Sequence, residues 1–242
     1  ELRILRGAYP DVIFNTSYDF EANDWKIEIN GTTLYWADGK MLTAGNLGNK
    51  DSFRPMLYRY AKEIPDPAAF TQEHIQEIRT FTSTENRRSQ EGNSLDFFNA
   101  VYDSATRRSV ERHITQVQFL GRSTNVHERI VEPLRRVEKR ILALARTDVE
   151  VQNFVGMLAR VDSYNWREIG DRSSRSFHSY GIAVDILPKG WGQKNIYWAW
   201  RRDIDPQNWM LLPLDRRWMP PQQIIDAFEK EGFIWGGKWI IW

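Results

Sequence analysis

The segment from residue 172 to residue 187 constrains the fold of this chain more than any other part of the sequence. Its last six residues, 182–187, alternate in the way that predicts a β-strand with two distinct faces. Asp185 is a carboxylate on a strand that is otherwise apolar on both faces, so we expect it to be paired, hydrogen-bonded or bound to a metal. His178 lies just upstream in a Ser-rich turn, and Gly181 lets the backbone turn between the two.

His178 and Asp185 can together supply two of the three protein ligands of an open zinc site, which leaves a position for water. A structural hydrogen bond is the alternative that the pair by itself leaves open. The chain contains no cysteine, so any metal must be held by histidine and carboxylate side chains. We expect the remaining histidines, His74, His113 and His127, to be structural or exposed.

The composition is that of a soluble chain that buries a core, with 41% hydrophobic and 27% charged residues in a length of 242. The formal net charge of +1 indicates neither a nucleic-acid partner nor an acidic polymer. No window approaches the roughly 18 consecutive apolar residues of a membrane helix, and the first residues do not resemble a signal peptide. We therefore expect no nucleic-acid partner and no transmembrane segment. A first residue other than methionine fits a mature secreted protein or a trimmed chain.

The N-terminal third is predicted to be rich in strands and loops. Residues 25–29 and 32–36 alternate around Asn30-Gly31, a favoured hairpin dipeptide, and Asp38-Gly39 supplies a second turn before residues 40–42. This pattern predicts a small β-meander. Recurrent Gly and Pro between residues 45 and 70 favour irregular connections, and residues 71–100 favour short helices broken by a polar loop at 83–94.

The second half is predicted to carry three helices. From Val126 onward, apolar residues recur at helical spacing, with Pro133 either kinking the helix or lying in its first turn: Ile130, Leu134, Val137, Ile141 and Leu144. The arginines of this helix could form a nucleic-acid surface, but the interleaved glutamates favour solvated ion pairs. The same period predicts helices over 151–161 and over 221–231, the last one stopped by Gly232.

The motif around His178 resembles the D-alanyl-D-alanine carboxypeptidase family of zinc peptidases, which includes VanY-type carboxypeptidases and L-alanyl-D-glutamate endopeptidases. The family signature is Ser-x-His-x-x-Gly-x-Ala-x-Asp, and this sequence matches every fixed position, with Ser176, His178, Gly181, Ala183 and Asp185. The resemblance extends over roughly residues 150–242.

Two further parts of the chain take part in the resemblance. The family has an arginine upstream of the motif, at a position like that of Arg167 in this chain. It also has a downstream segment Gly-Phe-x-Trp-Gly-Gly-x-Trp, which corresponds to residues 232–239. The resemblance implies that His178 and Asp185 bind zinc. It also implies that Arg167 is catalytic, because it would hold the substrate's carboxylate or carbonyl oxygen and stabilise the oxyanion.

The same resemblance implies roles for residues near these. Ser176 would contact the substrate or support a ligand, and Trp235 could line the substrate cleft, whereas we expect Trp239 to belong to the core. For Arg167, a surface salt bridge to Glu168 or Asp171 is the alternative. The zinc would activate a water and a carboxylate would shuttle its proton.

The sequence departs from the family pattern at its end. In the family, the third zinc ligand and the catalytic carboxylate follow the Trp-Gly-Gly-x-Trp segment in a motif of the form Asp-x-x-His or Glu-x-x-His, whereas this chain ends at Trp242. We therefore expect one Zn²⁺ whose third protein ligand lies beyond Trp242, in a natural protein that continues. A chain that ended here would hold zinc poorly and hydrolyse little.

These observations predict a zinc-dependent peptidase that hydrolyses D-amino-acid-containing bonds of peptidoglycan stem peptides, in the periplasm or outside the cell. The alternative is a non-catalytic peptidase-like domain that binds cell-wall peptide or a protein partner. A third interpretation makes the aromatic N-terminal meander a glycan- or wall-binding module, against a plain β-extension packed on the peptidase.

The expected fold class is α+β, with a small antiparallel sheet flanked by helices, as in Hedgehog-type domains and D,D-peptidases, and an N-terminal β-meander. We predict an extension over residues 1–105 and a zinc D,D-peptidase-like domain over 106–242, truncated at its C-terminal end.

Overall fold

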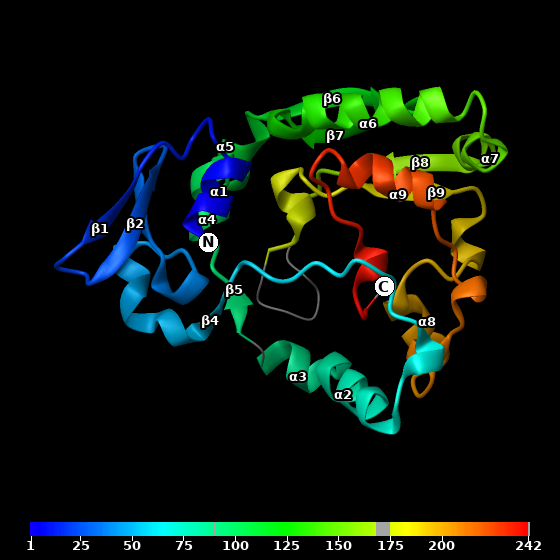
Figure 1. Cartoon of the computed structure of the whole chain (residues 1–242), viewed down its shortest axis with the longest axis horizontal. Helices are drawn as coiled ribbons and strands as arrows, with labels where there is room; N and C mark the ends of the chain where they lie inside the picture. Colours follow the sequence, from blue (N-terminus) through cyan, green and yellow to red (C-terminus); the bar gives the residue numbers. More distant parts are fainter. Residues whose placement is uncertain (90, 168–174, 242) are drawn as a thin grey trace. The chain divides into compact units, whose positions relative to one another are not determined.

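The computed structural model describes residues 1–89, 91–167 and 175–241. The chain divides into two compact units, each built from separated segments. The first unit comprises residues 1–59, 88–114 and 164–183, and the second comprises residues 60–87, 115–163 and 184–242. Small sheets, most of them antiparallel, and helices alternate along the chain (Figure 1), which confirms the α+β class. The predicted domain division at residue 105 stays a prediction.

The first unit contains the predicted meander, drawn in blue in Figure 1. Strands β1 (Thr16–Asp19), β2 (Asp24–Ile29) and β3 (Thr32–Tyr35) form an antiparallel sheet in sequence order. Asn30 and Gly31 have φ of 49° and 80°, the left-handed values that a tight hairpin turn requires. The hairpin is therefore confirmed, but strand β1 was not predicted, and the expected strand at 40–42 is reduced to a single bridge between Tyr35 and Leu42.

Helices α1 (Leu2–Ala8) and α4 (Asp96–Tyr102) complete the core of the first unit, and α5 (Arg107–Glu111) follows α4. The core joins the inward face of the meander to α1 and α4 and, from the 164–183 segment, to buried Tyr180 and partly buried Ile182. Residues 44–59 are irregular, as predicted, with a 3₁₀ segment (Ala44–Ser52) and a short strand β4 (Phe53–Arg54) that pairs in parallel with β5 (Gly92–Asn93).

The second unit is built around helix α6 (Val131–Leu144). Its buried residues Leu134, Val137 and Ile141 form the predicted stripe, and Pro133 lies in its first turn. The hairpin of β6 (Ile114–Phe119) and β7 (Arg122–His127) lies beside it, and Glu138 of α6 accepts a 2.6 Å hydrogen bond from the Leu120 amide in the hairpin turn. Helix α6 therefore both covers the hairpin and caps its turn.

The remaining elements of this core follow in sequence. Helix α7 (Val149–Met157) leads into strand β8 (Leu158–Asp162), which pairs antiparallel with β9 (Asp185–Pro188). Helix α9 (Gln222–Glu229) supplies buried Ile224 and ends near Gly232, whose φ of 85° confirms the predicted stop.

A second cluster in this unit lies around Trp209. It joins helix α2 (Gln72–Thr82) to α8 (Trp198–Ile204) and to the segment around Met210. Among the described residues, no helix is both long and apolar enough to cross a membrane.

Several predicted boundaries are wrong. The helix expected from Val126 begins at Val131, because residues 122–127 are strand β7. The helix expected over 151–161 ends at Met157, and Val161 belongs to strand β8. The polar run 83–94, expected to be a loop, contains helix α3 (Thr84–Ser89).

The arginines of α6 are engaged in ion pairs. Arg136 and Arg140 both bind the carboxylate of Glu231, and Arg135 binds Glu132 one turn earlier. These contacts agree with the interpretation of the helix as an ion-paired surface.

Candidate functional site

His178 lies in the first unit, on a 3₁₀ turn over Phe177–Tyr180. The Ser176 hydroxyl accepts a 3.4 Å hydrogen bond from the His178 amide and so caps the turn at its start. Gly181 ends the turn in the left-handed region at φ 68°, which a residue with a Cβ adopts only with strain. The imidazole is half-buried, whereas Ser176 is buried at 6% exposure. The observed contact of Ser176 is thus with the turn, and its contact with substrate stays a prediction.

The backbone of Arg167 is fastened to this turn. Its amide donates to the Ser179 hydroxyl at 2.8 Å, and that hydroxyl donates to the Arg167 carbonyl at 2.6 Å. Two further backbone bonds run from the Asn165 amide to the His178 carbonyl and from the Ser176 amide to the Arg167 carbonyl. Ser179 is fully buried and Arg167 is exposed, so the fixed backbone presents the guanidinium to solvent. Glu168 and Asp171, the alternative partners of Arg167, lie outside the described residues.

Arg175 anchors the segment that enters the turn. Its guanidinium lies over the Trp166 ring at 4.5 Å and over the Tyr180 ring at 5.6 Å. It also donates hydrogen bonds to the Asn99 side chain in α4 and to the Ser104 carbonyl. The sequence analysis missed both Arg175 and Ser179, because a serine and an arginine in a polar turn carry no periodic signal.

The turn rests on aromatic rings. Tyr180 is 1% exposed and stacks on Phe98 with ring centroids 5.1 Å apart. Burial raises the pKa of the Tyr180 hydroxyl to about 12, against the smaller opposing effect of the nearby Arg175 charge. The Tyr180 side chain is therefore neutral throughout the physiological range and serves as a packing surface under the turn.

Asp185 lies in the second unit and is the first residue of strand β9. It is exposed, and the expectation that it is paired, hydrogen-bonded or bound to a metal stays a prediction. The strand begins only at Asp185, so its expected length over 182–187 is wrong.

The residue directly opposite Asp185 is another carboxylate. Strand pairing places Asp162 of β8 across from Asp185, and Arg160 binds the Asp162 carboxylate at 2.7 Å. The hydrogen bond and charge of Asp162, with a smaller contribution from Asp185, raise the pKa of Arg160. Facing like charges repel each other, so this end of the β8–β9 ribbon favours a cation. The sequence analysis also missed Asp162.

Trp235 belongs to the second unit and is held by a polar network. Its amide donates to the Tyr60 hydroxyl at 2.9 Å, and Tyr60 donates in turn to the Glu229 carboxylate at 2.6 Å. Lys238, with a side chain only 5% exposed, binds the same carboxylate oxygen at 2.6 Å. Glu229 therefore fixes both ends of the segment from Trp235 to Lys238.

The indole of Trp235 lies directly over Gly237. A Cβ at Gly237 would come within 2.2 Å of the ring, so no other residue fits there without moving the indole. Trp235 is half-buried, which is compatible with a ring that has one free side. Trp239 is also half-buried, and its indole nitrogen is a buried donor without a partner in the described part of the chain.

The structure brings the backbone of Arg167 together with the turn of His178, whereas Asp185 and Trp235 belong to the other unit. An imidazole and a carboxylate are both donors that Zn²⁺ accepts. Across the described ranges, no three or more histidine, aspartate or glutamate side chains gather into a group that could hold a metal. The described residues thus fit zinc in donor type but supply only part of a three-ligand set.

Comparison with known proteins agrees with the sequence motif. Residues 1–58 match a domain of unknown function (DUF8518). No curated protein and no solved structure matches the chain. Residues 170–241, which include His178, Asp185 and Trp235, match the family described as D-alanyl-D-alanine carboxypeptidase. This C-terminal region is therefore similar to D-alanyl-D-alanine carboxypeptidases, and the match supports a peptidase of that kind.

Proposed function

We propose that this protein is a zinc-dependent peptidase that hydrolyses D-amino-acid-containing bonds of peptidoglycan stem peptides, in the periplasm or outside the cell. The single observation that carries the proposal is the family match over residues 170–241, which contains the complete Ser176-to-Asp185 signature. The proposal goes beyond that match in naming the metal, the substrate and the compartment.

His178 and Asp185 would hold the zinc in this proposal. Bound zinc supplies Lewis-acid polarisation of a carbonyl and lowers the pKa of water toward 7. The half-buried imidazole and the exposed carboxylate are both accessible to an ion.

Arg167 would recognise the substrate. Its exposed guanidinium projects from a backbone held by the buried Ser179 hydroxyl, so binding requires ordering of the side chain but not of the backbone. A guanidinium binds a carboxylate or a developing oxyanion through two parallel hydrogen bonds. Trp235 would offer an apolar surface beside the substrate backbone.

The test combines metal analysis with peptide digestion. We expect the protein, purified at its full natural length, to retain zinc after dialysis and to release products from purified muropeptides, detected by mass spectrometry. His178→Ala and Asp185→Ala should lose both zinc and hydrolysis. Arg167→Ala should keep its zinc but lose about 100- to 1000-fold in kcat/KM.

Matched variants separate these effects from general damage. Asp215→Ala removes an exposed carboxylate from the same unit as Asp185, and Arg146→Ala removes an exposed guanidinium; both should behave as wild type. Hydrolysis that survives complete chelation, or zinc that binds equally well without His178, would contradict the proposal. Zinc binding without hydrolysis of any muropeptide would point to a binding domain instead.

A further inference from the structure

One face of the N-terminal meander is only partly covered by the core of the first unit. Trp25, Ile27 and Ile29 alternate along β2 and so share a face of the sheet. Ile27 and Ile29 are 1% and 0% exposed, whereas Trp25 is 49% exposed. Strand pairing places Tyr18 of β1 directly opposite Trp25. The β2 residues on this face are therefore all apolar, and the outer end of the face, at Trp25, is open to solvent.

Three aromatic rings gather at this open end, which we call the aromatic tip: Tyr18, Phe20 and Trp25. Tyr18 lies 5.2 Å from Phe20 and 5.5 Å from Trp25 between ring centroids, and both contacts are edge-to-face. Phe20 is 88% exposed. Exposed large rings that cluster on one rigid element mark a binding surface more often than scattered single ones do.

The polypeptide that carries the aromatic tip is held rigid by hydrogen bonds. The Tyr18 hydroxyl donates to the Asn23 side chain at 2.8 Å. One Asp19 oxygen accepts from the Glu21 and Ala22 amides, and the other accepts from Lys26 at 2.8 Å. A ligand that binds here meets rings already in place, so binding costs little conformational entropy.

The charges around the aromatic tip select against anionic partners. Asp19, Glu21 and Asp24 all lie in or beside the β1–β2 turn, and the cation among these residues, Lys26, is paired with Asp19. Anionic lipids and nucleic acids need free cations at their contact surface. The tip therefore suits an uncharged ligand that offers C–H groups to the rings and hydroxyl or amide groups to the carboxylates.

We propose that the aromatic tip binds a neutral, N-acetylated glycan strand. The pyranose ring has an apolar C–H face that complements the electron-rich face of an indole or phenol ring, and its hydroxyl and acetamido groups match the acidic rim. The choice of this polymer rests on the proposed function, because such a strand carries the stem peptides in the cell wall. The tip would hold the protein on the carbohydrate and would not take part in hydrolysis.

Oligomers of N-acetylglucosamine test this directly, because they are uncharged and contain no stem peptide that the peptidase would cut. Isothermal titration of the full chain with these oligomers should show binding. Trp25→Ala and Phe20→Ser should each weaken it about tenfold, the loss of roughly one aromatic contact. Phe20 is nearly fully exposed, so Phe20→Ser should leave the thermal unfolding curve unchanged even if Trp25→Ala lowers it.

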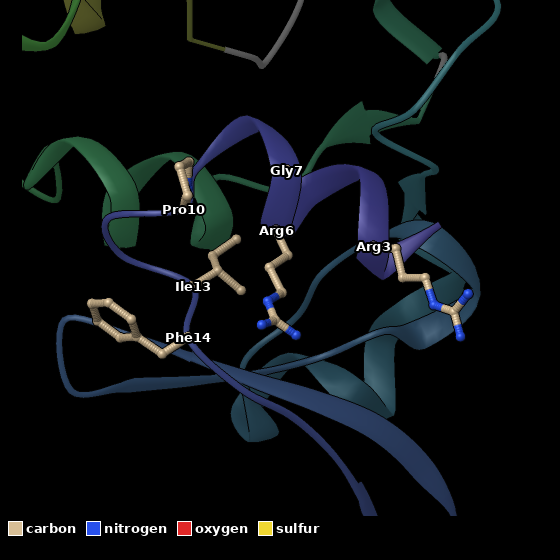
Figure 2. A pocket seen from close by; sticks show the side chains of 6 residues that line it. All are labelled: Arg3, Arg6, Gly7, Pro10, Ile13 and Phe14. Atoms are coloured by element: carbon tan, nitrogen blue, oxygen red, sulfur yellow. The ribbon is translucent and has the colours of Figure 1, made fainter.

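A second exposed aromatic in the same unit provides the matched control. Phe14 is 65% exposed and lies at an open hollow lined also by Arg3 and Arg6 (Figure 2). None of the three rings of the aromatic tip lines this hollow. Phe14→Ala should bind glycan as wild type does. Equal loss in Phe14→Ala, unchanged affinity in both tip variants, or binding to anionic vesicles in place of glycan would each overturn the proposal.

The test also separates this proposal from the peptidase proposal. His178→Ala should keep full affinity for the N-acetylglucosamine oligomers while it loses hydrolysis. Phe20→Ser should keep hydrolysis of soluble muropeptides while it loses affinity for these oligomers. If the protein binds glycan but cuts no muropeptide, the proposal that the aromatic tip binds glycan stands and only the peptidase proposal is refuted.

Discussion

A single buried hydroxyl joins Arg167 to the turn that carries His178. Ser179 accepts one hydrogen bond from the Arg167 amide and donates to the Arg167 carbonyl, with a longer contact to the Asn165 carbonyl at 3.3 Å. Ser179 is fully buried, so removal of its hydroxyl would leave the Arg167 amide without this partner. The side chain that sets the position of the guanidinium is therefore a serine with no charge and no metal-binding capacity.

We expect Ser179→Ala to lower the free energy of unfolding by about 1–3 kcal/mol, because buried backbone groups lose their partner. It should also lower kcat/KM, since the Arg167 backbone loses both hydrogen bonds to Ser179 and, among the described residues, keeps only its bond to the Ser176 amide. Chemical denaturation and muropeptide kinetics measure the two effects. Ser123→Ala, which removes an exposed hydroxyl from β7, should change neither; an unaltered Ser179→Ala protein would show that this hydroxyl fixes nothing.

A second prediction at the scale of single residues concerns Gly237. Because a methyl group there would overlap the Trp235 indole, Gly237→Ala should displace the ring and lower the free energy of unfolding by about 1–3 kcal/mol. Thermal unfolding and near-ultraviolet circular dichroism of the tryptophans report both changes. Gly192→Ala is the control, since nothing lies within 4 Å of its Cβ position. Equal stability of the two variants would contradict the packing described here.

At the scale of elements, the β1–β2 hairpin depends on one carboxylate. The hydrogen bond from Lys26, followed by that from the Ala22 amide, lowers the pKa of Asp19 from 3.8 to about 2. A depressed carboxyl pKa contributes stability that is complete above the unfolded value and is lost as the pH falls through the folded one. The hairpin should therefore loosen between about pH 4 and pH 2.

Nuclear magnetic resonance of the Trp25 indole across this pH range measures the loosening. Asp19→Asn, which keeps the shape of the side chain but loses its charge, should already show the loosened signal at neutral pH and should bind glycan more weakly. An indole signal that is constant from pH 5 to pH 2 would mean that Asp19 does not hold the turn.

Elements with strong local signals could be predicted from the sequence. The turn at Asn30-Gly31 and the stop at Gly232 were found because these residues adopt left-handed backbone angles cheaply. The stripe of α6 was found because its period matches one helix face. Its start was misplaced because Val126 and Ile130 continue the apolar spacing into a strand and a 3₁₀ turn, where tertiary pairing overrides local pattern.

The candidate site was predictable only in part. The sequence motif includes His178 and Asp185, and the family resemblance points to Arg167 upstream of it. The structure joins the Arg167 backbone to the turn that carries His178. Arg175 and Asp162 were not foreseen, because their partners come from α4, from two aromatic rings and from the strand opposite Asp185. Such contacts join residues far apart in sequence, and no local pattern encodes them.

At the scale of the whole molecule, the family-matched region depends on residues outside it. Tyr180 packs in a core made by residues of the meander, α1 and α4, and the Trp235 amide is held by Tyr60. A fragment limited to residues 170–241 lacks these partners. We expect it to be unfolded, with a collapsed amide spectrum, whereas the full chain shows dispersed signals. A fragment that folds and binds zinc alone would refute this dependence.

Each compact unit is assembled from three stretches of chain separated by stretches of the other. A gene break after residue 58, where the first family match ends, would divide the core of the first unit, and a break before residue 170, where the second match begins, would divide both cores. Neither matched region is therefore expected to fold as an independent gene. Shuffling of related genes should give folded chains when all residues of a core come from one parent, and unstable chains when a crossover divides a core.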